Sequence, residues 1–285
     1  MAGADAVDRR CGSSYNEKRC MPSLLSKLNA SIRSDSPLKT FGKCARYPFK
    51  KIAERATIGW RRKLLRRSTP AATFAKIYER NAWKDSESVS GAGSTLRYTE
   101  HLRKHLPGLF LHLSIKSVFD APCGDFNWMR QVVAETDIVY FGADIVPALI
   151  AENARRNGES RISFSVADIT VDKFPKVDLW ICRDCLFHLN NRDIYLALRN
   201  FVSAGAPYML TTTHLNDSGF KNTDIPTGDF RLLDLYSPPY CLPREVKARI
   251  TDWVEPHPPR EMCLWTKEQV SAALPTLEAA LKVRK

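Results

Sequence analysis

The sequence lacks any apolar run long enough to cross a bilayer, and its first residues lack the apolar core of a secretory signal. We therefore predict a cytoplasmic protein without a helical membrane span. It also lacks the regular cysteine spacing of a disulfide scaffold, since its eight cysteines are scattered, and we expect reduced thiols. One CxxC pair, Cys182 and Cys185, has no second pair to complete a zinc site and does not stand at a helix start as a redox motif would, so we assign it no metal-binding or redox role.

Excess charge is missing from most of the chain. Residues 1–70 hold 17 Lys and Arg against 5 Asp and Glu, whereas residues 71–285 hold 26 of each and are neutral. We predict a basic, poorly ordered leader over 1–70 and a globular domain over 71–285. The net charge of +12 thus describes the leader rather than the domain.

One part of the leader, residues 46–67, has the pattern of a basic amphipathic helix. Its apolar residues on one helical face are Ile52, Ala56, Trp60 and Leu64. Such a helix suits peripheral contact with an anionic membrane or with nucleic acid. A solvated linker and an organelle-targeting leader are equally consistent with this composition.

From residue 110 onward, short apolar stretches alternate with helical ones. We expect strands over 115–121, 137–145, 162–169, 177–182 and 207–214, and helices over 126–135, 147–156 and 191–204. This alternation is typical of βαβ units, so we predict an α/β fold with a doubly wound, mostly parallel sheet. Ligands of such sheets bind at the carboxyl ends of the strands.

Three successive predicted strands end at or near an aspartate, namely Asp120, Asp144 and Asp168. Each alone is explained by a turn or a helix cap, but together they predict an acidic ligand rim. The turn after the first strand has one glycine, Gly124, where a dinucleotide-binding loop has three. Asp144 follows Gly124 by twenty residues, a spacing at which a carboxylate accepts hydrogen bonds from ribose hydroxyls.

The stretches VFDAPCGDFNW, YFGADIV, FSVADI and VDLWICRDCLFHL make residues 115–215 resemble the class I S-adenosylmethionine-dependent methyltransferases. The resemblance implies a seven-stranded Rossmann-like sheet with an antiparallel last strand, formed within 249–255 and 262–270. It implies S-adenosylmethionine as cofactor, with Asp120 and Gly124 at the methionine moiety, Asp144 at the ribose and Asp168 with Ile169 at the adenine. We include Pro122, Ile145 and Arg183 among the cofactor-binding candidates. Pro122 and Phe126 stand where the commonest family pattern has glycine.

Residues 71–110 are expected to form an N-terminal cap of the methyltransferase domain. Its Ser/Gly run, 87–95, precedes a predicted helix over 96–106. We expect backbone N–H groups and Ser94 of this run to bind the methionine carboxylate, with a flexible linker as the alternative. Trp83 and Tyr78 are expected to be buried anchors of the cap rather than stacking surfaces.

The loop after the fourth predicted strand carries the candidate catalytic residues. His188 suits a general base for a hydroxyl acceptor, and Asp184 would orient it or contact the acceptor. Arg183 would pair with Asp184 or with an acidic substrate. Local packing is the alternative for His188. His214, at the end of the fifth strand, is expected at the same functional rim and is the second candidate base.

These features predict O-methylation of a hydroxyl on a small molecule or glycan. The chain lacks the Asn/Asp-Pro-Pro-Tyr sequence of amino-methylating enzymes after the fourth strand. Two alternatives stay open: an RNA methyltransferase that uses the basic leader, and a catalytically silent binding protein. The stretch 222–243 is either a lid or a packed connection, and its polar candidates are Asp229, Arg231, Tyr236 and Tyr240.

Overall fold

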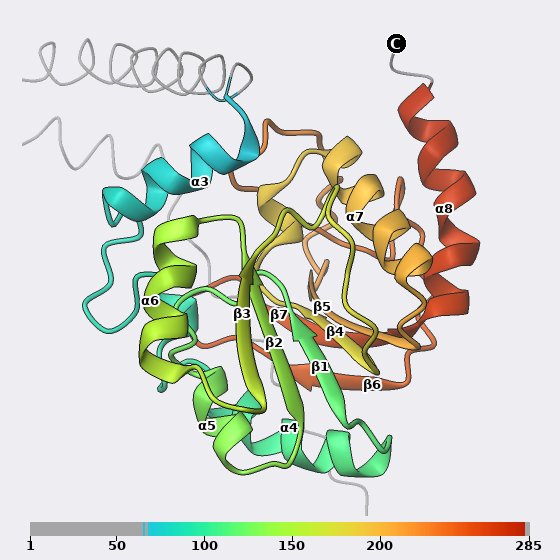
Figure 1. The fold of residues 1–285 in the computed structure, drawn as a ribbon. Helices are drawn as coiled ribbons and strands as arrows, with labels where there is room; N and C mark the ends of the chain where they lie inside the picture. Colours follow the sequence, from blue (N-terminus) through green and yellow to red (C-terminus); the bar gives the residue numbers. More distant parts are fainter. Residues whose placement is uncertain (1–64, 66–67, 283–285) are drawn as a thin grey trace, which may run out of the picture. The chain divides into compact units, whose positions relative to one another are not determined.

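A computed structural model of the chain describes Leu65 and residues 68–282. Apart from Leu65, the predicted helix within 46–67 lies outside these residues. The described chain folds into one seven-stranded sheet with helices packed against it (Figure 1). Within the described part, no helix is long and apolar enough to cross a membrane.

The sheet has the strand order β3-β2-β1-β4-β5-β7-β6. Its parallel part consists of β1 (Ser117–Asp120), β2 (Val139–Asp144), β3 (Ile162–Val166), β4 (Leu179–Cys182) and β5 (Tyr208–His214). Strand β7 (Arg260–Thr266) runs antiparallel to both β5 and β6 (Ala248–Thr251). The predicted doubly wound sheet with an antiparallel final pair is therefore confirmed.

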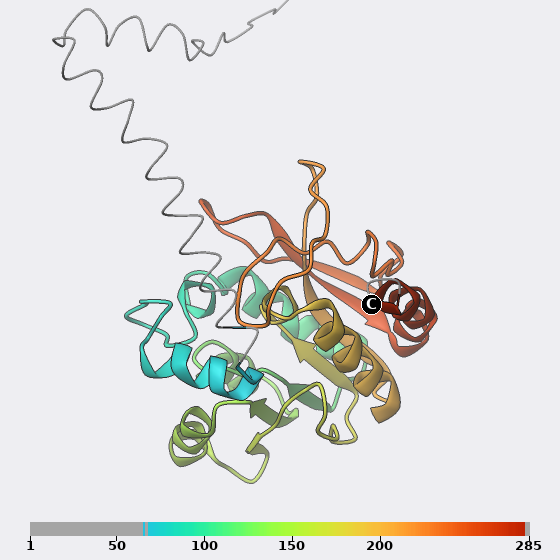
Figure 2. The same ribbon diagram turned by 90° about the horizontal axis from the view of Figure 1, so that it is seen from above.

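Two apolar clusters cover the faces of the sheet. Helices α7 (Asn191–Ala204) and α8 (Lys267–Lys282) lie side by side in one cluster (Figure 2). Helices α4 (Glu100–His112) and α5 (Met129–Ala134) contribute to the other. Helix α6 (Pro147–Asn157) packs against β2 and β3. These layers leave the carboxyl ends of the parallel strands open to a ligand.

Helix α4 differs from its prediction, because it continues through Pro107 to His112. Proline removes one backbone hydrogen bond and costs a helix interior about 3 kcal/mol. The stripe Leu102, Leu106 and Phe110 is buried on both sides of that proline. Burying each such side chain contributes about 1.5–3 kcal/mol, so burial of these three side chains outweighs the cost of the proline.

Helix α3 (Pro70–Glu79) lies across the carboxyl end of the sheet (Figure 1). It begins where the side chain of Thr69 accepts a hydrogen bond from the Ala72 N–H, and Pro70 occupies its first position. After α3 the chain passes through a short 3-10 helix, η1 (Ala92–Ser94), before entering α4. The segment from α3 to η1 therefore covers the strand ends where a ligand would bind.

Candidate active site

A cavity of about 400 Å³ is lined by residues at the carboxyl ends of β1 to β4 and by residues of α3. This volume falls within the usual range of small-molecule sites. The cavity brings together eleven of the residues predicted as site residues, which are Ser94, Asp120, Pro122, Gly124, Asp144, Ile145, Asp168, Ile169, Arg183, Asp184 and His188. It does not include His214.

The turn after β1 is built around Gly124. Its φ of +56° is left-handed, and a Cβ there would lie 2.3 Å from the Ser90 hydroxyl oxygen. Its N–H donates to Asp144 Oδ2 at 3.3 Å, which ties the first turn to the end of β2. Glycine is thus required here both by the backbone conformation and by the close approach of Ser90.

The Ser/Gly run is fixed to the next residue of this turn. Asp125 Oδ2 accepts hydrogen bonds from the Ser88 hydroxyl at 2.8 Å and from the Val89 N–H at 3.0 Å. In return, the Asp125 N–H donates to Ser90 Oγ at 2.9 Å. The run therefore lies against the first turn as a bound segment, with its residues 89–94 lining the cavity.

Phe126 adopts a left-handed φ of +57° at a position where the commonest family pattern has glycine. Such a conformation costs a residue with a Cβ about 1–2 kcal/mol. The ring is only 1% exposed and packs against Tyr140 and Phe164, with centroids 4.8 and 5.1 Å away. Burial of the ring offsets the backbone cost, which explains how the departure is accommodated.

The strand-end carboxyls are held in different surroundings. Asp120 is 2% exposed and accepts a hydrogen bond from the Tyr140 hydroxyl at 2.7 Å, and burial raises its pKa to about 7. Burial also raises the pKa of Asp144, to about 6, against the opposing hydrogen bonds from backbone N–H groups. Asp168 is partly exposed, and its Oδ1 accepts from the Thr170 N–H at 2.9 Å. Of Asp120 and Asp144, the more deeply buried Asp120 therefore has the higher pKa.

We expect Asp120→Asn to change how stability depends on pH. The carboxyl has a pKa of about 4 in an unfolded chain and about 7 in the fold, so the folded state binds the proton more tightly. Its stabilising contribution is complete below about pH 4 and is lost as pH rises to 7. The unfolding free energy of the wild type, relative to Asp120→Asn, should fall by roughly 3 kcal/mol over that range. Urea unfolding of both proteins at several pH values measures this difference. If the unfolding free energies of the wild type and Asp120→Asn changed in parallel with pH, the prediction would be wrong.

Beside the acidic rim, four charged side chains form a cluster in which Arg183, Asp252 and Arg260 are buried and Asp184 is partly exposed. Arg183 donates to Asp252 through Nε at 2.8 Å and Nη2 at 3.0 Å. Arg260 Nη2 donates to Asp184 Oδ2 at 2.7 Å, and Arg183 Nη1 lies 3.6 Å from the same oxygen. Arg183 therefore pairs within the protein, mainly with Asp252. Burial opposes ionisation of Asp184, but Arg183 and Arg260 outweigh it and hold its pKa below the ordinary value.

Sequence reasoning missed Asp252 and Arg260. Asp252 directly follows β6 and Arg260 begins β7, so the antiparallel pair brings both to a site otherwise built from β1 to β4. Arg260 also lies over the ring of Tyr98, 4.9 Å from its centroid. No local pattern marks either residue, because their partners Arg183 and Asp184 are distant in the sequence.

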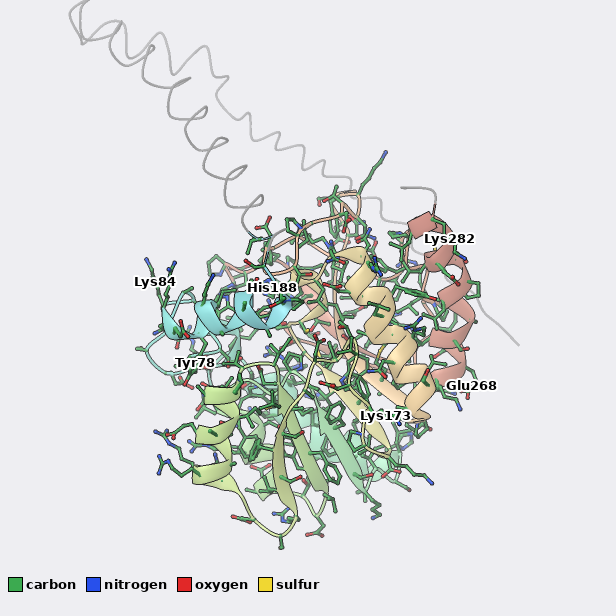
Figure 3. All side chains as sticks on the ribbon, turned by 45° about the horizontal axis from the view of Figure 1, so that its top comes forward. Tyr78, Lys84, Lys173, His188, Glu268 and Lys282 are labelled. Carbon is green, nitrogen blue, oxygen red and sulfur yellow. The ribbon has the colours of Figure 1, made fainter. Side chains whose placement is uncertain are left out.

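His188 is the last residue of the short 3-10 helix η2 (Leu186–His188) and lies beside α3 (Figure 3). Its Nδ1 is 2.8 Å from the backbone carbonyl oxygen of Asp229, which can only accept. Nδ1 therefore carries the hydrogen and Nε2 keeps its lone pair. Burial lowers the pKa of His188, so the ring is neutral at pH 7. Nε2 forms no hydrogen bond with any described residue.

His214, the second candidate base, is not placed at the cavity. The side chain is 1% exposed, its Nδ1 accepts from the Leu233 N–H at 3.2 Å, and its ring packs against Phe187. Burial lowers its pKa to about 4. The expected position of His214 on the functional rim is therefore not what the structure shows.

The stretch 222–243 is largely a packed connection. Arg231 is 6% exposed and donates to the Leu189 carbonyl and the Tyr240 hydroxyl, while Tyr240 is 1% exposed. Tyr236 donates its hydroxyl to Glu261. From this stretch only Phe230 lines the cavity.

Trp83 departs from the expectation of a buried anchor. Its side chain is 40% exposed and lines the cavity, with its ring centroid 6.4 Å from that of His188. Tyr78 lines the cavity as well. The CxxC cysteines are buried and free, and no group of three or more metal-ligand residues occurs in the described part of the chain.

No protein-family model matches this sequence, and a search of the curated proteins gives no match either. Among solved structures, the chain is similar to an S-adenosylmethionine-dependent methyltransferase from Leishmania major. The TM-score is 0.53 at 13% identity, over 71% of this chain and 89% of that one. The chain has the class I methyltransferase fold.

Two further methyltransferase structures are similar at lower scores. Magnesium protoporphyrin IX methyltransferase from Synechocystis, with bound SAH, has a TM-score of 0.49 at 10% identity, over 66% of this chain and 92% of that one. Human N-acetylserotonin methyltransferase, in complex with SAM, has a TM-score of 0.47 at 13% identity, over 84% of this chain and 65% of that one. At such identities the likeness concerns the fold, so the side chains of the cavity must indicate the chemistry.

Proposed function

We propose that this protein is an S-adenosylmethionine-dependent methyltransferase that methylates a hydroxyl group of a small molecule or glycan. The observation that carries the proposal is one shared cavity. It holds the strand-end carboxyls Asp120, Asp144 and Asp168 together with His188, whose Nε2 is available as a base. The methyltransferase fold agrees with this assignment.

The residues of the cavity fit the cofactor. Asp144 accepts hydrogen bonds from the backbone N–H groups of Gly124 and Val146, and the Ile145 N–H also contributes, whereas an ionised carboxylate has about four acceptor positions. The remaining positions suit ribose hydroxyls. Ile145 and Ile169 also line the cavity and supply apolar surface for a planar base. We assign Ser94 and the adjoining N–H groups to the methionine carboxylate.

Bound S-adenosylmethionine would supply an electrophilic methyl group on a sulfonium sulfur. His188 would accept the hydroxyl proton at Nε2 while the acceptor oxygen takes up that methyl group. The Nδ1–H bond to the Asp229 carbonyl fixes the ring and stabilises the positive charge that it gains. The carboxylate of Asp184 in the same cavity also favours that charge.

Calorimetry with S-adenosylmethionine tests the cofactor assignment. We expect the wild type to bind and Asp144→Ala to bind roughly 10–100-fold more weakly, because hydrogen bonds to a charged group are lost. Asp217→Ala, an exposed aspartate away from the cavity, is the matched control and should bind like the wild type. Absence of binding by the wild type would instead identify a silent protein of this fold.

Labelled S-adenosylmethionine, incubated with the protein and a fractionated lysate, tests the acceptor class. We expect the label in small molecules or glycans. Label in RNA would overturn the proposed acceptor and favour the alternative in which the basic leader, residues 1–70, binds nucleic acid.

A further inference from the structure

We propose that the acceptor is a planar aromatic molecule bearing a hydroxyl group, which packs against Trp83 and Phe230 while its hydroxyl meets His188. The inference rests on the proposed function and narrows the acceptor of that same site. It follows from the surface that surrounds the Nε2 atom of His188.

Two aromatic rings remain exposed beside this histidine. Trp83 is 40% exposed and Phe230 is 49% exposed, and they are the aromatic members of the exposed large apolar residues in the described chain. Both line the cavity, and their ring centroids lie 6.4 and 5.9 Å from that of His188. Large rings left exposed at the same cavity are typical of a surface that a ligand covers.

The neighbouring wall is also aromatic. Phe187 lies 4.6 Å from the His188 ring and 5.5 Å from that of Phe230, measured between centroids. Phe74 and Tyr78 of α3 line the cavity as well. Aromatic pairs are favourable at centroid distances of about 4.5–7 Å, and Trp83, Phe187 and Phe230 all lie within that distance of the His188 ring, so an aromatic ligand beside His188 would meet aromatic side chains.

A sugar and a phenol differ in the number of hydroxyl groups that the site must pair, and two carboxyls of the cavity lining already accept hydrogen bonds from the protein. Asp193 accepts hydrogen bonds from Asn190 and Thr227, and Asp184 accepts one from Arg260. A sugar ring brings several hydroxyls, and each one buried without a partner weakens binding. A phenol brings one hydroxyl, and Nε2 of His188 is an available partner for it.

The proton transfer also favours an aromatic hydroxyl. His188 is a weak base because burial lowers its pKa. A phenol with a pKa of about 10 lies roughly four units above an ordinary imidazole. An aliphatic hydroxyl, closer to the value of about 15.7 for water, lies roughly nine units above it. General-base catalysis by this histidine is therefore far easier for a phenol.

A matched set of probes tests the inference by calorimetry on the protein saturated with S-adenosylhomocysteine. The probes are 2-naphthol, its saturated analogue decahydro-2-naphthol, and methyl β-D-glucopyranoside. We expect 2-naphthol to bind at least about tenfold more tightly than either of the others, from stacking against two rings.

Variants of the two rings localise the effect. Trp83→Ala and Phe230→Ala should each weaken 2-naphthol binding about 2–10-fold. Trp83→Phe keeps an aromatic face and should retain most of the wild-type affinity for 2-naphthol. Leu111→Ala, an exposed apolar residue that does not line the cavity, is the control and should bind 2-naphthol like the wild type. Affinity for S-adenosylhomocysteine, measured on each variant, verifies that the site is folded.

The outcomes separate the two proposals. If the wild type does not bind S-adenosylhomocysteine, the proposed function fails. If it does bind, but 2-naphthol binds no better than the saturated alcohol, fails to bind, or binds more weakly than the glucoside, the aromatic acceptor is wrong while the proposed function stands. Equal 2-naphthol affinity in Trp83→Ala, Phe230→Ala and the wild type would also overturn it.

Discussion

Replacement of His188 by glutamine is expected to lower kcat for methyl transfer by about 10²–10⁴-fold, the usual contribution of a general base. Glutamine keeps a polar side chain of similar reach but cannot accept the hydroxyl proton. Affinity for S-adenosylmethionine should change little, since we assign the cofactor to the carboxyls that follow β1 to β3. The measurement is steady-state kinetics with 2-naphthol, paired with calorimetry on the cofactor.

The pH profile separates a base from a packing residue. Burial lowers the pKa of His188, so the wild-type kcat should rise with pH through a midpoint below 6.5 and be constant near pH 7. In His188→Gln this acidic limb should disappear. The residual rate of the variant should instead increase toward pH 10, where the phenol ionises without help. A merely structural histidine would leave the shape of the profile unchanged.

A companion variant provides the control for this result. His214→Gln alters a buried histidine that packs against Phe187 outside the cavity. It should affect stability more than kcat, and its pH profile should keep the acidic limb. An equal loss of kcat in both variants, with unchanged profiles, would contradict the role of His188.

The parallel sheet was predictable because its signals are local. Each strand is a short apolar stretch, and Asp120 and Asp144 mark the ends of β1 and β2 within that same stretch. The carboxyl-end rule for parallel sheets then places both acids at one edge. Helix α7 has the predicted bounds, and in the structure Asn190 caps its start and Gly205 ends it in the left-handed conformation.

The incorrect predictions concern residues whose position in the fold depends on contacts with segments distant in the sequence. The His214 side chain packs against Phe187 rather than into the cavity, although the residue ends a strand at the correct edge. Trp83 was expected to be buried, but it follows a helix that crosses the cavity and so remains partly exposed. Neither outcome can be read from spacing, because each depends on which segment covers the residue in the fold.

The largest expected loss of stability comes from Asp252→Ala. The side chains of Arg183 and Asp252 are 4% and 0% exposed, and two hydrogen bonds of 2.8 and 3.0 Å join them. Removing the carboxylate leaves two buried arginines with Asp184 as the remaining acid of the cluster. Breaking a buried pair in this way costs about 3–5 kcal/mol, which urea unfolding would show as a lower free energy of unfolding.

The loss should come from the unpaired arginine rather than from the missing attraction alone. The double variant Arg183→Leu/Asp252→Leu removes both charges and is therefore expected to be more stable than Asp252→Ala. Glu100→Ala, which breaks the exposed pair with Lys104, should leave the unfolding curve almost unchanged because solvent screens that pair. A change below about 1 kcal/mol in Asp252→Ala would mean that water reaches Arg183 and that the cluster does not couple the antiparallel strands to the site.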